Sequence, residues 1–219
     1  MLDKRLQTIA DTVRRDRRVA DIGTDHAYLP VALVQAGITP FAIACDLREG
    51  PLENARRAVR EAGLTERIDC RLGDGLAPIK QGEAEEIVIA GMGGETIAAI
   101  LEACPWSKTA GIHYIFQPMT RSEDLRRYLL TNGYTILAET TLNQNGRLYV
   151  IVEAEWTDAP SVSEESDYLL GKLDGARDRE WLLHQKNVLT KRIDGLTKAG
   201  EQDEVTHLTA ILHKLEERL

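Results

Sequence analysis

Residues 18–30 constrain this chain most, because they place a short apolar run, a glycine and a helix-like segment in immediate succession. The run Val19-Ala20-Asp21-Ile22 is typical of a buried strand. Gly23 interrupts it, and residues 30–36 have the composition of a helix. A strand, a glycine turn and a helix form the ligand-binding unit of doubly wound α/β proteins, at the carboxyl edge of a parallel sheet. We therefore expect an α/β fold.

The turn itself indicates which ligand it holds. A dinucleotide site uses G-x-G-x-x-G so that the backbone can approach a pyrophosphate closely. Here only Gly23 fits, and Asp25 and Ala27 occupy the next alternate places. The carboxylates of Asp21 and Asp25 would repel a pyrophosphate but attract a cationic ligand. S-adenosylmethionine carries a sulfonium and an ammonium and no phosphate, so we expect this cofactor and consider a dehydrogenase the least favoured enzyme.

The order of predicted elements defines the fold class further. Leu2, Leu6, Ile9 and Val13 predict an amphipathic helix over residues 2–16. Five alternating strand–helix units follow, and Asn145-Gly146 predicts a terminal hairpin. We expect a Rossmann-like, seven-stranded class I methyltransferase sheet, with strands at residues 18–22, 41–46, 68–72, 86–90, 111–116, 134–141 and 148–156.

Residues 157–166 mark a boundary, because proline, serine and acidic residues cluster there without periodicity. Beyond it, Leu182, Leu189 and Leu196 recur every seven residues, which predicts a helix with a coiled-coil seam. A second leucine-rich helix follows Gly200. We expect a methyltransferase domain over residues 1–157 and an α-helical coiled-coil hairpin over residues 158–219.

Composition excludes several classes of protein. No apolar run is long enough to span a membrane, and the first residues lack the apolar core of a secretory signal. The three cysteines, Cys45, Cys70 and Cys104, are far apart, so we expect reduced thiols and no zinc site. These features predict a cytoplasmic protein with no membrane partner and no metal. The oligomeric state stays open, a monomer included.

The net charge of −8 argues mildly against a nucleic-acid partner, yet residues 1–18 hold six basic and three acidic side chains. Local patches decide encounter with RNA more than net charge does. The basic residues of this segment are either a solvated helix face or a phosphate-contacting patch beside the cleft, and the pattern favours neither. They are Lys4, Arg5, Arg14, Arg15, Arg17 and Arg18.

Other strand ends carry further candidate ligand groups. Asp46 ends the second strand, 21 residues beyond Asp25, near the spacing at which a carboxylate accepts both ribose hydroxyls of an adenosine. Asp74, between Gly73 and Gly75, is either an ordinary turn residue or an acceptor for the adenine amine. The segment Gly91-Met92-Gly93 allows close approach of the chain to a bulky ligand.

These motifs together resemble the bacterial tRNA (adenine-22-N1)-methyltransferase family, known as TrmK. The resemblance is carried by residues 21–30 (Asp-Ile-Gly-Thr-Asp-His-Ala-Tyr-Leu-Pro), 73–76, 89–94 and Gln117-Pro118, and it extends to the C-terminal helical hairpin. It implies a class I fold, methyl transfer from S-adenosylmethionine to N1 of an adenine in tRNA, and a coiled-coil domain that assists tRNA binding. One departure is Met119, where the family commonly has an asparagine after Gln-Pro.

The candidate residues have expected roles along the length of the cofactor. Asp21 and Gly23 hold its methionine end, Asp46 holds the ribose and Asp74 holds the adenine. Gly91, Met92 and Gly93 border the cofactor and the target base, and Leu47, Gly73 and Gly75 are further expected cofactor contacts. Asp25 is the first candidate for catalysis, followed by His26 and Tyr28. Lys4, Arg5, Arg14, Arg15, Gln117 and Pro118 are the candidate tRNA contacts.

Plainer roles exist for the catalytic candidates, and other functions compete. Asp25 could cap the following helix, His26 could pack at its start, and Tyr28 could belong to the core. A methyltransferase of a small metabolite or a protein would need a closed pocket with a lid. A non-catalytic binding module would use the helical hairpin to recruit partners, although the acids that end the first two strands argue against a decayed site.

Overall fold

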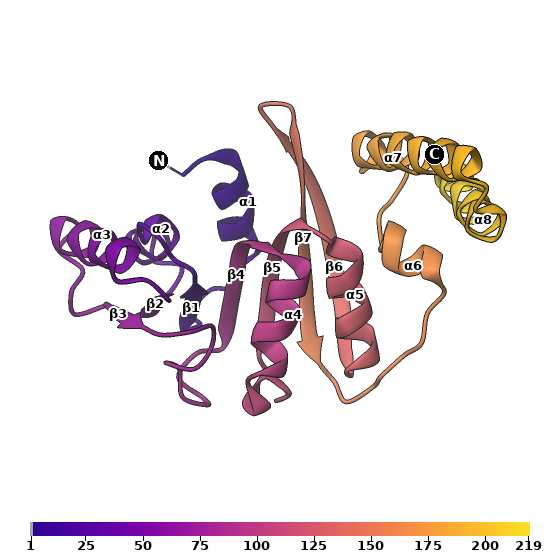
Figure 1. Ribbon diagram of the computed structural model, residues 1–219. Helices are drawn as coiled ribbons and strands as arrows, with labels where there is room; N and C mark the ends of the chain where they lie inside the picture. Colours follow the sequence, from indigo (N-terminus) through magenta and orange to yellow (C-terminus); the bar gives the residue numbers. More distant parts are fainter. Residues whose placement is uncertain (1) are drawn as a thin grey trace.

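The computed structural model describes residues 2–219 and contains a seven-stranded sheet in the order β3-β2-β1-β4-β5-β7-β6 (Figure 1). The parallel strands β1–β5 carry the ligand edge, and β7 runs antiparallel between β5 and β6. The predicted class I methyltransferase sheet is confirmed. The strands are β1 Val19–Ile22, β2 Ala42–Asp46, β3 Ile68–Leu72, β4 Glu86–Gly93, β5 His113–Thr120, β6 Tyr134–Gln144 and β7 Arg147–Trp156.

Helices cover both faces of the sheet. Successive residues of β4 point to opposite sides: Val88 packs in the core under α1 and α2, whereas Ile87 and Ile89 pack in the core under α4 and α5. Both faces are therefore apolar, as expected for a parallel sheet covered on both sides. The helices are α1 Lys4–Thr12, α2 Tyr28–Gln35, α3 Glu49–Glu61, α4 Gly94–Glu102, α5 Ser122–Thr131, α6 Glu165–Leu170, α7 Arg179–Ala199 and α8 Gln202–Arg218, with a short 3-10 helix at Pro105–Ser107.

Helix α1 is shorter than its apolar periodicity predicted. The Asp3 side chain caps its start by accepting from the N–H of Leu6 at 2.8 Å. The helix ends at Thr12, and Asp16 adopts a left-handed conformation with φ of 62° while its N–H donates to the carbonyl of Ile38. This tertiary hydrogen bond holds residues 13–18 outside the helix.

The hairpin of β6 and β7 turns at Asn145 and Gly146, which have φ values of 54° and 79°. Both are left-handed, as a tight hairpin turn requires, so the predicted Asn-Gly turn is confirmed. In Figure 1 the tip of this hairpin stands above the carboxyl ends of the parallel strands, between α1 and α7.

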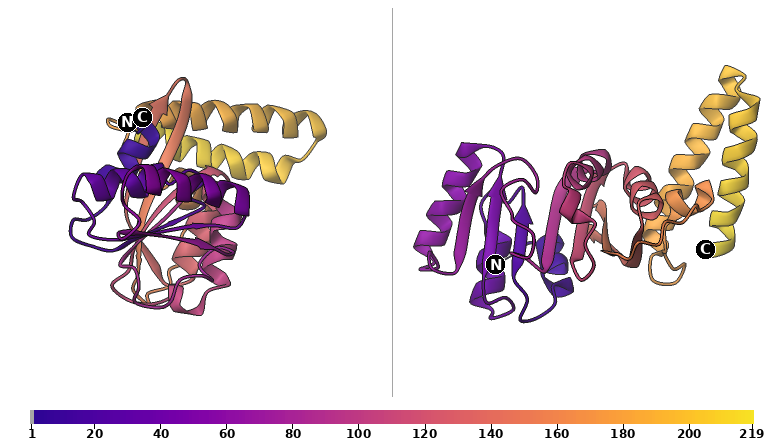
Figure 2. Two further views of the ribbon diagram at one scale, coloured as in Figure 1. Left: turned by 90° about the vertical axis from the view of Figure 1, so that its left-hand side faces the viewer. Right: turned by 90° about the horizontal axis from the view of Figure 1, so that it is seen from below.

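The C-terminal helices α7 and α8 run antiparallel and project from the side of the sheet where β6 lies (Figure 2). Leu189, Leu208, Ile211 and Leu215 form the seam between them, together with Leu170 of α6. The base of α7 belongs to the sheet's own core, because Trp181 and Leu182 pack there. The helical hairpin is thus anchored in the core of the sheet through the start of α7.

A buried ion pair also joins the two parts. Nε of Arg126 on α5 contacts Oε1 of Glu139 on β6 at 2.6 Å, and both side chains are fully buried. Nη1 of Arg126 donates to the carbonyls of Tyr168 and Leu169, and Glu139 accepts from the N–H of Lys172. The pair therefore fastens α6 and its exit to the sheet.

Cys45 and Cys104 are buried, Cys70 is half-buried, and all three thiols are free. Across residues 2–219, every helix is too short or too polar to cross a membrane. The same residues contain no cluster of three or more His, Cys, Asp or Glu side chains arranged for a metal ion.

Candidate active site

The site begins where β1 ends. Gly23 is left-handed, with φ of 75°, and its N–H and that of Thr24 donate to the carbonyl of Cys45 at 2.8 and 2.9 Å. A Cβ at Gly23 would lie 2.4 Å from Cε of Met92. Glycine is needed here for its backbone conformation, and the tip of the Met92 side chain from β4 packs against the turn.

The next residues form a strained turn. Asp25 and Ala27 are left-handed, with φ of 51° and 53°, a conformation that non-glycine residues rarely adopt. The N–H of Asp25 donates to Oδ2 of Asp46, 3.4 Å away. The side chain of Asp25 is 65% exposed. Strain of this kind persists where the surroundings hold it, commonly at functional sites, and here it presents a carboxylate to the cleft.

Two rings lie beside that carboxylate. His26 and Tyr28 stack with centroids 5.1 Å apart and planes 14° from parallel, and Nε2 of His26 lies 3.8 Å from Oδ1 of Asp25. Tyr28 is 58% exposed, so it is not a core residue. The pair offers a flat surface at the mouth of the cleft, next to a hydrogen-bond acceptor.

Asp21 and Asp46 are buried at the ends of their strands. Burial raises the pKa of the Asp21 carboxyl to about 6; the Thr24 hydroxyl and nearby Arg5 oppose this rise, and the charge of Asp46 increases it. No cationic side chain of residues 2–219 comes within 4 Å of Asp21. A buried carboxylate without a counter-ion is costly, so this position suits a ligand that brings a positive charge.

These groups line a single cavity of about 610 Å³ at the carboxyl edge. It receives residues from the turns after β1, β2 and β3, from the end of β4, and from α1, α2 and α4. The cavity brings together most of the predicted cofactor and catalytic residues, and Arg5, a predicted tRNA contact, lines it as well. The cofactor and catalytic residues are Asp21, Gly23, Asp25, His26, Tyr28, Asp46, Leu47, Gly73, Asp74, Gly75, Gly91 and Met92. They converge because parallel strands end at the same edge.

Helix α4 forms one wall of the cavity, which the sequence analysis did not predict. Thr96 and Ile100 line the cavity, and a Cβ at Gly75 would lie 2.9 Å from Cγ2 of Ile100. The signal available was the start of this helix at Gly94, immediately after the glycine-rich β4 end. Its facing residues depend on the rotation of the helix, which periodicity alone does not specify.

Arg5 reaches the cavity and joins it to β5. Its Nη1 donates to Oε1 of Gln117 at 2.8 Å, and its backbone N–H donates to Oε1 of Gln144 at 2.6 Å. Gln117 is fully buried, and its Nε2 donates to the carbonyl of Pro118. Gln117 therefore lies behind Arg5, and neither of the predicted substrate residues Gln117 and Pro118 lines the cavity. Gly93 also lies outside it, as the cap of α4.

The predicted basic patch is not assembled at the cleft, so the expectation that it lies there is wrong for Arg14 and Arg15. Both follow α1 in the segment that leads into β1, at the amino ends of the parallel strands. Arg14 forms an ion pair with Glu155 at 2.6 Å. The chain has crossed from one edge of the sheet to the other along α1. Of the candidates, Lys4 and Arg5 remain at the carboxyl edge, where Nζ of Lys4 donates to the carbonyl of Asn143.

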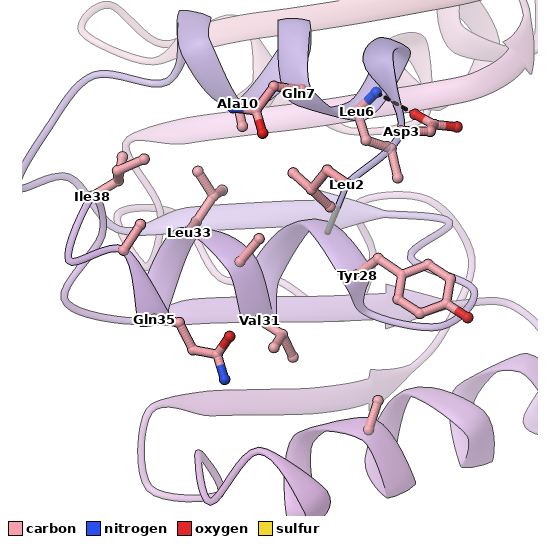
Figure 3. A pocket seen from close by; sticks show the side chains of 13 residues that line it. Leu2, Asp3, Leu6, Gln7, Ala10, Tyr28, Val31, Leu33, Gln35 and Ile38 are labelled. Atoms are coloured by element: carbon pink, nitrogen blue, oxygen red, sulfur yellow. Dashed lines mark hydrogen bonds between the residues drawn. The ribbon is translucent and has the colours of Figure 1, made fainter.

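A second groove, between α1 and α2, has a volume of about 690 Å³ (Figure 3). It shares Asp3, Leu6 and Tyr28 with the first cavity, but its lining is mostly aliphatic. Placed polar groups, rather than volume, determine a site for a charged small molecule. The cavity lined by the five aspartates Asp3, Asp21, Asp25, Asp46 and Asp74 is thus the better cofactor site, and its carboxylates match the ammonium and hydroxyls of S-adenosylmethionine.

Comparison with known proteins points the same way. Residues 2–152 match the family model of a methyltransferase domain. The chain is 38% identical over 188 residues to the tRNA (adenine(22)-N(1))-methyltransferase of Bacillus subtilis, covering 86% of this chain and 77% of that protein.

Solved structures agree. The crystal structure of the B. subtilis m1A22 tRNA methyltransferase TrmK matches with a TM-score of 0.86 at 32% identity, over 99% of this chain and 98% of that one. A Streptococcus pneumoniae protein solved in complex with S-adenosyl-L-methionine matches with a TM-score of 0.82 at 34% identity, over all of both chains.

Proposed function

The chain belongs to the tRNA (adenine-22-N1)-methyltransferase family, and on that premise we propose that it transfers a methyl group from S-adenosylmethionine to N1 of adenine 22 in tRNA. The observation that carries this proposal is the buried carboxylate of Asp21, which has no counter-ion within 4 Å among residues 2–219, in a cavity that also presents Asp25 and a stacked ring pair at its mouth. The family relationship supplies the identity of the RNA and of the base.

Three acidic residues of the cavity would each bind a different part of the cofactor. Asp21 would bind the ammonium at the methionine end of the cofactor. Asp46 would accept hydrogen bonds from the ribose hydroxyls through its free lone pairs, and Asp74 would accept one from the adenine amine. Leu47 is 62% exposed beside the cavity and would cover an adenine face. When bound, S-adenosylmethionine supplies an electrophilic methyl group on a sulfonium.

The reaction needs orientation more than it needs a base. Adenine N1 has an in-plane lone pair, so no proton must leave before attack, and methylation leaves a positive charge on the ring. Positioning of reactants can contribute about 7–11 kcal/mol. Asp25 would accept a hydrogen bond from the adenine amine and stabilise the developing charge, with the His26–Tyr28 pair holding the ring plane.

Access to the cavity supports an RNA substrate over a small metabolite. The catalytic candidate Asp25 and the ring of Tyr28 are both more than half exposed. An open mouth admits a base that has been flipped out of its stack, whereas a metabolite enzyme needs enclosure. We assign residues 1–157 to catalysis and residues 158–219 to holding tRNA, and place the reaction in the cytoplasm.

Incubation with methyl-labelled S-adenosylmethionine and unmodified tRNA transcripts tests this function. We expect label in tRNA, a reverse-transcription stop next to position 22, and N1-methyladenosine in the nucleoside digest. A matched transcript with guanine at position 22 should remain unlabelled. Label at another position, or on protein alone, would contradict the proposal.

A further inference from the structure

A third groove, of about 520 Å³, lies at the carboxyl edge on the side of β5 away from the cofactor cavity. Its walls are the end of β5, the turn of the β6–β7 hairpin and the first turns of α7. The argument uses six of its residues: Met119, Arg121, Arg147, Tyr149, Trp181 and His184.

The groove and the cofactor cavity are lined by neighbouring residues of β4 and β5. In the pairing of β4 with β5, Met92 lies opposite Pro118 and Gly93 opposite Thr120. Met92 lines the cofactor cavity, whereas Pro118 and Thr120 line the groove. A polynucleotide whose base enters the cavity therefore has its neighbouring nucleotide at or near this groove.

The charge of the groove suits a phosphate. Arg147 is exposed and forms no ion pair within residues 2–219, and exposed His184 faces the same groove. Arg121, by contrast, is shared among Asp124, Glu95 and Glu123 at 2.5, 3.4 and 3.6 Å. Arg147 is thus the available guanidinium, and guanidinium groups bind phosphate oxygens in paired hydrogen bonds.

The rest of the groove suits a base. Tyr149 is half-buried and Met119 is 45% exposed, so both offer apolar surface to a flat ring. Trp181 is only 8% exposed, and its indole N–H finds no acceptor in residues 2–219. A buried indole N–H ordinarily donates to an acceptor, so the groove contains one hydrogen-bond donor that has no acceptor. A cation beside sequence-tolerant stacking surfaces is the usual design for unpaired nucleotides.

The walls are braced against one another. Nζ of Lys4 donates to the carbonyl of Asn143, Gln144 accepts from the N–H of Arg5, and Nδ2 of Asn143 donates to Glu180 at the start of α7. The hairpin that carries Arg147 is therefore held both by α1, which lines the cofactor cavity, and by α7. Figure 1 shows this tip between the two helices.

We infer that this groove binds the unstacked nucleotide next to the target adenosine, with its phosphate at Arg147 and His184 and its base against Met119 and Tyr149. The inference rests on the proposed function and adds a substrate subsite to it. The role of Arg147 is to position the RNA, so its loss should affect tRNA binding and leave the cofactor site unchanged.

The test uses the full-length variants Arg147→Ala and His184→Ala, with Arg60→Ala as the matched control. Arg60 is an exposed cation on α3, which lies at the opposite end of the sheet from α7 (Figure 1). We expect Arg147→Ala to raise the KM for tRNA about tenfold, as for one charged hydrogen bond, with the Kd for S-adenosylmethionine unchanged. The salt dependence of tRNA binding should fall by about 0.7 in log–log slope for the phosphate lost.

Phosphate-ethylation interference on tRNA locates the contact. With the unaltered protein, ethylation of the phosphates flanking the methylated nucleotide should block binding, and Arg147→Ala should lose this interference while Arg60→Ala keeps it. Unchanged KM in Arg147→Ala, or lost interference at distant phosphates only, would overturn the inference. Methylation of tRNA by the unaltered protein is scored separately, so its absence would refute the proposed function instead.

Discussion

The N–H of Asp25 donates to Oδ2 of Asp46 across 3.4 Å, so the acid that ends β2 holds the strained turn after β1. Oδ1 of the same carboxylate accepts from the N–H of Arg48 at 2.9 Å. Asp46 thereby organises two turns at the cavity in addition to its proposed contact with ribose. The position of the catalytic candidate Asp25 depends on this carboxylate.

Asp25→Ala should lower kcat for tRNA methylation at least about 100-fold, the usual cost of removing one group that stabilises transition-state charge. The Kd for S-adenosylmethionine should change by less than about threefold, because the exposed carboxylate is turned to the cavity mouth. Single-turnover methyl transfer and calorimetric titration measure the two effects. Asp11→Ala, an exposed acid on α1, is the control, and near-normal turnover in Asp25→Ala would remove Asp25 from the mechanism.

Asp46→Asn should affect both functions together. Loss of the charged acceptor should weaken S-adenosylmethionine binding by about 10- to 100-fold. It should also release the Asp25 turn, so that kcat at saturating cofactor falls as well. Titration followed by saturated single-turnover assays separates the two. A pure change in Kd would show that the turn does not need Asp46.

Cofactor binding should depend on pH through Asp21, whose pKa is raised to about 6 by burial. The ammonium of the cofactor binds the ionised carboxylate, so affinity is full above pH 6 and should fall by about tenfold per pH unit below it. Calorimetry at pH 6 in buffers of different ionisation enthalpy should detect release of a proton on binding. In Asp21→Asn the slope between pH 5 and 7 should vanish; persistence of the slope would assign it to another group.

His113 should make stability depend on pH above neutrality. Its Nδ1 lies 2.7 Å from Glu86 and its Nε2 lies 3.3 Å from Glu153. Burial lowers the pKa of His113, but the two glutamates outweigh burial and raise it to about 9. A raised pKa stabilises the folded state fully below about pH 6.5, and this contribution, on the order of 3 kcal/mol, is lost as pH rises through 9.

Thermal unfolding of His113→Gln should therefore show a smaller decline between pH 7 and 9.5 than the unaltered protein. His207→Gln, an exposed histidine on α8, serves as the matched control and should keep the full decline. Equal pH profiles for His113→Gln and the unaltered protein would show that His113 carries no charge between Glu86 and Glu153.

Arg126→Leu should cost about 3–5 kcal/mol of unfolding free energy, because it leaves Glu139 buried without its partner. Arg126→Leu combined with Glu139→Leu should recover part of that loss, since no unpaired charge remains. The surface arginine variant Arg56→Leu should change stability by no more than about 1 kcal/mol. Denaturant unfolding measures all three, and equal losses in Arg126→Leu and Arg56→Leu would contradict a stabilising buried pair.

Local sequence patterns determined the fold class and the identity of the ligand edge. The apolar run before Gly23, the acid at Asp46 and the Asn145-Gly146 turn each depend on the preferences of a few consecutive residues. The sheet pairs those strands in parallel, so strand-end residues had to meet at one edge. For this reason most of the predicted cofactor residues line one cavity.

Only the tertiary structure decided which side chains from outside the strand ends also lie at the carboxyl edge of the sheet. Arg5 reaches Gln117 while Arg14 ends at the far edge beside Glu155, although both belong to the same basic segment. The direction of α1 across the sheet separates them, and helical periodicity carries no information on that direction. The pairing of Arg126 with Glu139 and the docking of Trp181 likewise join residues far apart in the chain, because long-range packing rather than local preference holds them.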